Sequence, residues 1–269
     1  MPELIRDDIT LHYEVDGSGP PLLLLAGMLS DSATWMGLLP LLTDSFTVIR
    51  PDNRTTGRTE PKDAPADPVL MAQDALALMD HLGHARFHCA GHSLGGLLTL
   101  ELASGHPDRI ATASVLASGR VRSPRTLALF DTLLAIRRAP EGEEMWLRAL
   151  YPWIFGDGFF ADPGNVDLAL EAALAYPHGQ PLAAMAHQVE AFRNFRPQAQ
   201  LARVTSPTLV LHAGQDIMVP PDIARESLAA LPNAEHHVID HAGHSIVWDA
   251  TAEVAAHLRR FLGAHPIAA

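Results

Sequence analysis

The chain has 269 residues, of which 48% are hydrophobic; this is enough for a sizeable core and excludes a disordered chain. The net charge of −12, from 31 acidic and 19 basic residues, argues against nucleic acid or a membrane as a partner, because phosphates are bound by clustered lysines and arginines. The longest apolar run, 22–26, is far shorter than the roughly 20 residues that span a bilayer. Residues 1–10 are polar and acidic, unlike a secretory signal. The single cysteine, Cys89, cannot form an intrachain disulfide. We therefore expect a cytoplasmic protein.

The first predicted elements are two short strands, 4–5 and 9–15, which form an antiparallel hairpin at the edge of a sheet. After them, apolar runs alternate with segments of helical length, and several runs lack polar alternation, as is typical of strands buried on both faces. The expected strands are 22–26, 46–50, 87–90, 111–116, 208–212 and 237–239, and the expected helices between them are 35–42, 69–82, 95–104, 222–231 and 252–262. This alternation predicts an α/β fold in which helices flank a mostly parallel sheet.

The segment 120–200 interrupts the alternation. It contains no strand candidate, and prolines separate its helix candidates, which are 124–137, 141–150, 166–175 and 182–192. We interpret an all-helical insertion between two strands of a parallel sheet as a cap. The chain therefore divides into a core of 1–119 and 201–269 and a helical cap of 120–200, rather than into two independent domains.

The motif with the most specific chemistry is Gly91-His92-Ser93-Leu94-Gly95, which follows an expected strand and precedes an expected helix. Strand, sharp turn and helix form the context of a nucleophile elbow. The serine of such an elbow has strained backbone, and a side chain two residues before or after it would clash with neighbouring elements. The helix that follows directs its N-terminus at the site and favours negative charge there. Ser93 is therefore the predicted nucleophile.

A serine hydroxyl is a weak nucleophile and needs a base that an acid holds in place. His244 is the predicted base, since it lies between the last expected strand and the last expected helix. Asp216 is the predicted acid, because it follows the strand 208–212. Ser93, Asp216 and His244 all come at carboxyl ends of parallel strands, where open α/β sheets place their sites. Their order along the chain is the one that accompanies a nucleophile elbow.

Other side chains could take these two roles. Two carboxylates could replace Asp216, namely Asp222 and Asp240. The rival bases are His236, His237 and His241, of which the first two suit a packing or surface role in or beside a strand. A metal site formed by His237, His241 and His244 is disfavoured, because no carboxylate or thiolate recurs at ligand spacing. We expect neither a metal ion nor another cofactor.

Acyl transfer also requires donors for the oxyanion. The backbone N–H of Leu94, the residue after the nucleophile, is one predicted donor. The second is the backbone N–H of Met28, in the loop that follows the strand 22–26. Cys89 lies on the strand before the elbow and is expected to be a small buried hydrophobic residue rather than a nucleophile.

Together these motifs resemble the α/β-hydrolase superfamily over essentially the whole chain. The matching segments are Gly17-x-Gly19-Pro20-Pro21, 52–59, 91–96, 106–110, 207–216 and 242–244. The resemblance implies a sheet of about eight strands with the second antiparallel, and a cap formed by 120–200. One departure is that Ala26-Gly27 stands where family members often have His-Gly, which leaves the backbone donor in place. A serine at the elbow excludes relatives with a carboxylate nucleophile, such as haloalkane dehalogenases and epoxide hydrolases.

These residues predict a serine hydrolase that cleaves a small, largely apolar carboxylic ester or lactone through an acyl-enzyme. The alternatives that the resemblance leaves open are a 3-oxoadipate enol-lactonase-like lactonase, a C–C bond hydrolase, a cofactor-free perhydrolase and, in another class, a non-catalytic small-ligand receptor. Aromatic residues concentrate in the cap and favour an apolar substrate region. The predicted pocket residues are Leu29, Trp153, Phe159, Ile217 and Val219, and the candidates for polar contacts from the cap are His178, His187 and Arg193. The oligomeric state is not predicted.

Overall fold

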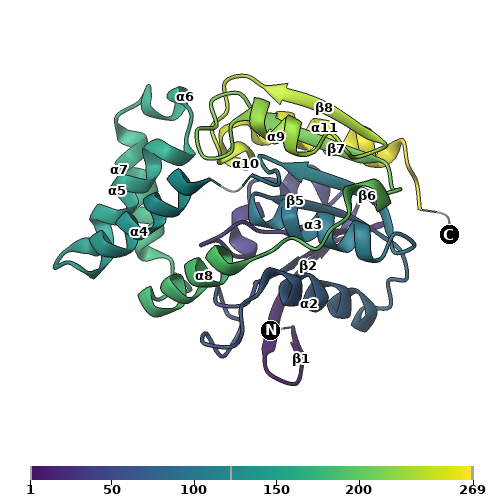
Figure 1. The fold of residues 1–269 in the computed structure, drawn as a ribbon, viewed down its shortest axis with the longest axis horizontal. Helices are drawn as coiled ribbons and strands as arrows, with labels where there is room; N and C mark the ends of the chain where they lie inside the picture. Colours follow the sequence, from purple (N-terminus) through teal and green to yellow (C-terminus); the bar gives the residue numbers. More distant parts are fainter. Residues whose placement is uncertain (1, 122, 268–269) are drawn as a thin grey trace.

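The computed structural model describes residues 2–121 and 123–267, and its centre is an eight-stranded sheet (Figure 1). The strands lie in the order β1-β2-β4-β3-β5-β6-β7-β8. Their bounds are β1 Glu3–Ile5, β2 Thr10–Gly17, β3 Pro21–Leu25, β4 Thr47–Pro51, β5 Phe87–His92, β6 Ile110–Leu116, β7 Thr208–Ala213 and β8 Ala234–Ile239. β2 pairs antiparallel with both β1 and β4, whereas β3 to β8 pair in parallel. The predicted α/β fold, the edge hairpin and the antiparallel second strand are confirmed.

Helices cover both faces of the sheet. The longer helices of the core are α2 Pro68–His81, α3 Leu94–Gly105 and α11 Thr251–Gly263, and the shorter ones are α1 Leu39–Leu42, α9 Pro221–Ser227 and α10 Ile246–Asp249. β3 shows how the sheet separates two apolar layers. Leu23 and Leu25 pack in a cluster with residues of α2 and α3, while Leu22 and Leu24 pack in a second cluster with residues of α1 and α11. The near-continuous apolar runs of the central strands follow from this burial on both faces.

Two expected helices are shorter than predicted. The segment 35–42 divides into a 3-10 turn, Ser32–Trp35, and α1, because Pro40 suits only the first turn of a helix. The segment 222–231 is helical only as α9, which ends at Ser227. The other expected helices agree with the structure to within a few residues at each end.

Between β6 and β7 the described residues form helices only. These are α4 Pro124–Arg138, α5 Gly142–Ile154, α6 Asp157–Phe160, α7 Gly164–Ala175 and α8 Leu182–Asn194, followed by the 3-10 turn Leu201–Arg203. They form an apolar cluster that includes Phe130, Leu133, Trp146 and Met185, and Met218, which follows β7, also belongs to it. In Figure 1, α4 to α7 lie together at one side of the sheet, and α8 returns from them toward the core. None of the described helices is long and apolar enough to cross a membrane.

Candidate active site

Ser93 lies at the turn between β5 and α3, in the strained backbone that an elbow requires. Its φ is 53° and its ψ is −117°, a conformation that L-residues rarely adopt. The two flanking glycines allow this turn. A Cβ on Gly91 would lie 2.0 Å from the carbonyl oxygen of Gly95, and a Cβ on Gly95 would lie 1.9 Å from that of Leu25. The motif therefore has its predicted geometry, with the serine placed at the carboxyl end of β5.

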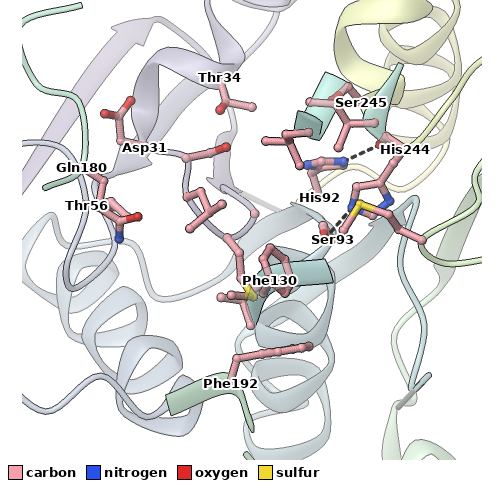
Figure 2. Close-up of a pocket in the computed structure, with 18 of the residues that line it drawn as sticks. Asp31, Thr34, Thr56, His92, Ser93, Phe130, Gln180, Phe192, His244 and Ser245 are labelled. Atoms are coloured by element: carbon pink, nitrogen blue, oxygen red, sulfur yellow. Dashed lines mark hydrogen bonds between the residues drawn. The ribbon is translucent and has the colours of Figure 1, made fainter. Parts of the chain in front are cut away.

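The structure brings Ser93, His244 and Asp216 together in one chain of hydrogen bonds. The Oγ of Ser93 lies 2.9 Å from Nε2 of His244, and Nδ1 of His244 lies 2.7 Å from Oδ2 of Asp216 (Figure 2 shows Ser93 and His244). A carboxylate can only accept, so Nδ1 carries the proton and Nε2 presents its lone pair to the serine hydroxyl. Both His244 and Asp216 are buried, which strengthens these bonds relative to bulk water.

The backbone orients Asp216 as well. Its second carboxyl oxygen, Oδ1, accepts hydrogen bonds from the N–H groups of Met218 and Val219, both at 2.8 Å. These bonds fix the plane of the carboxylate, so that Oδ2 alone is directed at the imidazole. The two alternative acids, Asp222 and Asp240, are exposed on the surface.

The rival histidines have other partners. His236 bonds through Nδ1 to Nε2 of His212 at 2.9 Å, His237 lies 3.4 Å from Glu235, and His241 lies 3.4 Å from Glu253. Across residues 2–121 and 123–267, no group of three or more potential metal ligands converges. Cys89 is fully buried beside Thr99, and burial raises the pKa of its thiol to about 12, as suits a small core residue.

The two predicted oxyanion donors also lie at this site. Met28 and Leu94 both line the cavity at Ser93, and neither backbone N–H has an acceptor among the described residues. Leu94 is the first residue of α3, whose N–H has no acceptor within the helix. Leu29 has a positive φ of 62°, and its N–H donates to Oε1 of Gln188 at 2.9 Å. The insertion thus holds the loop that carries Met28.

His92, beside Ser93, supports the loop of His244. Its Nε2 donates to the backbone carbonyl of His244 at 2.7 Å, and the two rings lie 5.1 Å apart. Burial, and then the neighbouring His244, lower the pKa of His92 to about 4. A neutral His92 is consistent with its single donated bond and adds no positive charge next to His244.

A cavity of about 1070 Å³ opens over Ser93 and His244 (Figure 2). Its walls come from the carboxyl edge of the sheet and from α4, α5, α7 and α8, and they are mainly apolar. Of the predicted pocket residues, Leu29 and Val219 line it. Of the predicted polar residues, His178 and Arg193 line it, whereas His187 instead bonds to the carbonyl of Ala64 at 2.9 Å.

Three predicted pocket positions need correction, because Trp153, Phe159 and Ile217 are not among the lining residues. The guanidinium of Arg125 lies over the ring of Trp153, at 5.9 Å. Phe159 stacks on Phe155 with ring centroids 4.0 Å apart, and Ile217 is 44% exposed on the surface. Aromatic content predicted an apolar region correctly, but it could not tell which rings pack against each other.

A family model of the alpha/beta hydrolase fold matches residues 20–251. The chain belongs to this family. Among its relatives is "Putative carbamate hydrolase RutD" of Pseudomonas syringae pv. syringae (strain B728a), which is 31% identical over 263 residues, or 95% of this chain and 98% of the relative. The family assignment and the printed names of such relatives support a hydrolase.

Two solved structures of this fold cover nearly the whole chain. The enol-lactonase from Burkholderia xenovorans LB400 superposes with a TM-score of 0.84 and 25% identity, over 97% of this chain and 100% of that one. A thermophilic esterase from Thermogutta terrifontis superposes with a TM-score of 0.83 and 26% identity, over 96% of this chain and 95% of that one.

Several residues that hold this candidate site together were not predicted from the sequence. Oδ2 of Asp249 accepts from the N–H groups of Gly243 and Gly156, both at 2.8 Å, and so joins the loop of His244 to the turn after α5. The side chain of Gln215 accepts from the N–H of Asp157 at 2.7 Å. These bonds link residues far apart in the chain, and no local motif signals them.

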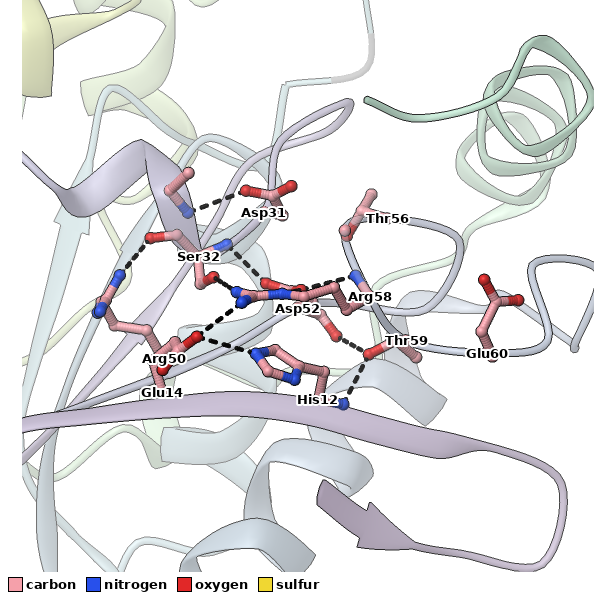
Figure 3. A network of polar contacts seen from close by, with 12 residues as sticks. His12, Glu14, Asp31, Ser32, Arg50, Asp52, Thr56, Arg58, Thr59 and Glu60 are labelled. Carbon is pink, nitrogen blue, oxygen red and sulfur yellow. Dashed lines mark hydrogen bonds and ion pairs between the residues drawn. The ribbon is translucent and has the colours of Figure 1, made fainter. Parts of the chain in front are cut away.

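A network of charged side chains holds the segment that follows the loop of Met28 in the chain (Figure 3). Asp52 accepts from the N–H groups of Ser32 and Arg58, at 2.9 and 2.8 Å. Burial alone would raise the pKa of Asp52, but these hydrogen bonds hold it below the usual range. The Arg58 guanidinium reaches Glu14 at 2.7 Å. The neighbouring carboxylate of Asp31 caps the turn Ser32–Trp35. The segment 52–59 therefore holds the start of the turn Ser32–Trp35, and two of its residues, Thr56 and Gly57, line the cavity.

Proposed function

We propose that the protein is a serine hydrolase that cleaves a carboxylic ester or lactone through an acyl-enzyme on Ser93. The observation that carries this proposal is the chain of hydrogen bonds from Ser93 through His244 to Asp216, opening into a cavity. An isolated serine hydroxyl does not react at neutral pH, whereas a serine paired with an oriented neutral imidazole does.

The geometry supports the following steps. Oγ of Ser93 attacks the substrate carbonyl carbon as its proton passes to Nε2 of His244, and Asp216 stabilises the imidazolium that forms. The N–H groups of Met28 and Leu94 donate to the oxyanion. His244 then protonates the leaving alcohol, and afterwards takes a proton from the water that releases the acid. Each step uses only groups of this chain and water.

We also propose that residues 120–200 act as the cap of this site on the core of 1–119 and 201–269. Helices α4, α5, α7 and α8 supply much of the cavity wall, and Gln188 of α8 bonds to the loop of Met28. A wall built from an insertion can vary without disturbing the sheet, so the cap would select the substrate.

The triad by itself does not select the reacting group of the substrate. Esters, enol-lactones and carbamates all offer a carbonyl to the same triad, and relatives include a named carbamate hydrolase and an enol-lactonase. A C–C bond hydrolase or a perhydrolase would use the same three residues. We favour an ester or lactone because the wall of the cavity that opens over Ser93 is mainly apolar.

The test is to compare the wild-type protein with Ser93→Ala on short-chain aryl esters. We expect the variant to fold and to lose hydrolysis, because the methyl group of alanine fits the site but carries no nucleophile. Turnover equal to that of the wild type would overturn the mechanism. Rates on an ester, an enol-lactone, a carbamate and a dienoic ring-cleavage product, measured side by side, then identify the reacting group.

A further inference from the structure

The charged side chains that line the cavity have a positive net charge, whereas the net charge of the whole chain is negative. Among the described residues, four arginines face it, Arg120, Arg137, Arg193 and Arg196, against two carboxylates, Asp31 and Glu143. The whole chain carries a net charge of −12. An excess of arginines over carboxylates in the wall of one cavity, in an otherwise acidic protein, indicates a local role for positive charge.

Arg137 is the most enclosed of these four cations. Its side chain is only 9% exposed, whereas Arg120 and Arg196 are exposed residues and Arg193 pairs with Asp131 at 2.5 Å. The guanidinium of Arg137 lies over the ring of Trp146, at 4.9 Å, so the face of the cation is fixed by a cation–π contact. The edge of the guanidinium is then left to bind a ligand.

Most N–H groups on that edge lack a strong acceptor within residues 2–121 and 123–267. Nε donates to both carboxyl oxygens of Glu143 at 3.0 Å, and Nη1 contacts the sulfur of Met185 at 3.5 Å, which is a weak acceptor. A guanidinium has five N–H donors in a planar fork that matches a carboxylate. The remaining donors therefore suit a bidentate anion.

Glu143 neutralises Arg137 only in part. Its side chain is 60% exposed, so water screens its charge far more than that of the enclosed guanidinium. The turn between α4 and α5 is tight, since a Cβ on Gly142 would lie 2.1 Å from the carbonyl oxygen of Ile136, and Arg137 and Glu143 bond across it. An anion at the remaining N–H groups of Arg137 would therefore meet an enclosed cation whose counter-charge is partly screened by water.

The position of Arg137 sets the length of the ligand. Arg137 follows Phe130 by seven residues on α4, which corresponds to about 10 Å along the helix axis. Phe130 belongs to an apolar cluster, and Met28, whose N–H is a proposed oxyanion donor, packs against this cluster. Apolar wall residues of α5, Leu147 and Leu150, also line the cavity.

We propose that Arg137 binds a carboxylate at the far end of the substrate, separated from the scissile carbonyl by an extended apolar chain. This inference rests on the proposed function and specifies its substrate as an amphipathic ester with one apolar arm that ends in an anion. Arg137 is the specificity residue, Trp146 and Glu143 hold it in place, and the apolar walls accept the chain between the two ends.

The test uses matched pairs of esters that differ only in the terminal group. One series consists of p-nitrophenyl monoesters of dicarboxylic acids from succinate to suberate, each compared with its methyl-capped neutral form. A second pair, 5-acetoxypentanoate and its methyl ester, places the carboxylate on the alcohol side. The measured quantity is the ratio of kcat/KM for the anionic substrate to that for the neutral one.

We expect wild-type protein to favour the anionic form in at least one series, most strongly for the longer chains. Arg137→Gln should lower that ratio about 10- to 100-fold, as loss of a hydrogen bond between charged groups does, with most of the change in KM. Arg137→Lys should retain part of the preference. The control is Arg148→Gln on α5, where Arg148 pairs with Glu144 and Asp167 outside the cavity, and it should leave the ratio as in the wild type.

Equal ratios for wild type and Arg137→Gln in both series would overturn the inference, as would a wild-type preference for the neutral forms throughout. Glu143→Gln provides an independent readout if Arg137→Gln does not fold, because removal of the counter-charge should raise the ratio. Hydrolysis of neutral aryl esters by the wild type tests the proposed function separately, so the two can fail independently.

Discussion

Replacement of Asp216 by asparagine is expected to lower kcat about 10⁴-fold, although the protein should fold as before. In the structure Oδ2 of Asp216 accepts the Nδ1 proton of His244 at 2.7 Å, while Oδ1 accepts from the N–H groups of Met218 and Val219. Because Oδ1 must remain an acceptor for these two N–H groups, the asparagine NH₂ would face Nδ1. The imidazole would then adopt the other tautomer, with its proton on Nε2 directed at Ser93.

A base that already carries the proton on Nε2 cannot take one from the serine. The factor of about 10⁴ corresponds to about 5.5 kcal/mol of transition-state free energy. The assay is steady-state hydrolysis of a short-chain p-nitrophenyl ester, followed by p-nitrophenol release, with thermal unfolding to verify the fold. Asp222→Asn and Asp240→Asn are the controls, and both should retain wild-type kcat. A loss of less than tenfold in Asp216→Asn, or a large loss in a control, would show that Asp216 is not the acid.

Two further predictions concern the elbow and the response to acid. Gly95→Ala should abolish folding to the active form, because its Cβ would lie 1.9 Å from the Leu25 carbonyl oxygen. The control Gly105→Ala has open space around the new Cβ, so it should fold and remain active. Circular dichroism measures folding of both variants, and ester hydrolysis measures their activity. Burial lowers the pKa of His88 and of His212 to about 4, so the unfolded chain binds protons that the folded one does not between about pH 6.5 and 4. The free energy of unfolding, measured in urea, should have its highest value above pH 6.5 and fall by up to about 3 kcal/mol per histidine as the pH approaches 4. A free energy of unfolding that stays constant from pH 7 to 4.5 would contradict this.

Sequence patterns predicted the parts of the fold that depend on residues close together in the chain. The strand before Ser93 and the helix after it follow from an apolar run and a glycine-flanked turn, and both lie as expected. Asp216 and His244 follow the carboxyl ends of strands, and a parallel sheet brings such ends to one edge, so their proximity was predictable without any contact information. Met28 was predictable for the same reason, as the loop after β3 reaches that edge.

The features that could not be predicted depend on packing between distant segments. Trp153 and Phe159 belong to an aromatic-rich segment, but whether a ring faces a cavity or a neighbouring ring depends on helix rotation, which composition does not specify. Gln188 reaches Leu29 across 159 residues of sequence, and Asp249 joins two loops that are 93 and 6 residues away from it. Such contacts leave no local pattern, because each partner alone is an ordinary polar residue.

The most direct test of the account is whether Ser93 itself becomes covalently modified. Incubation with a serine-directed fluorophosphonate, followed by intact mass and peptide mapping, should give one adduct, located on Ser93, with concurrent loss of ester hydrolysis. Ser93→Ala should show no adduct, and Asp216→Asn should react much more slowly. The absence of an adduct on Ser93 in the wild-type protein would contradict the account and favour a non-catalytic receptor of the same fold.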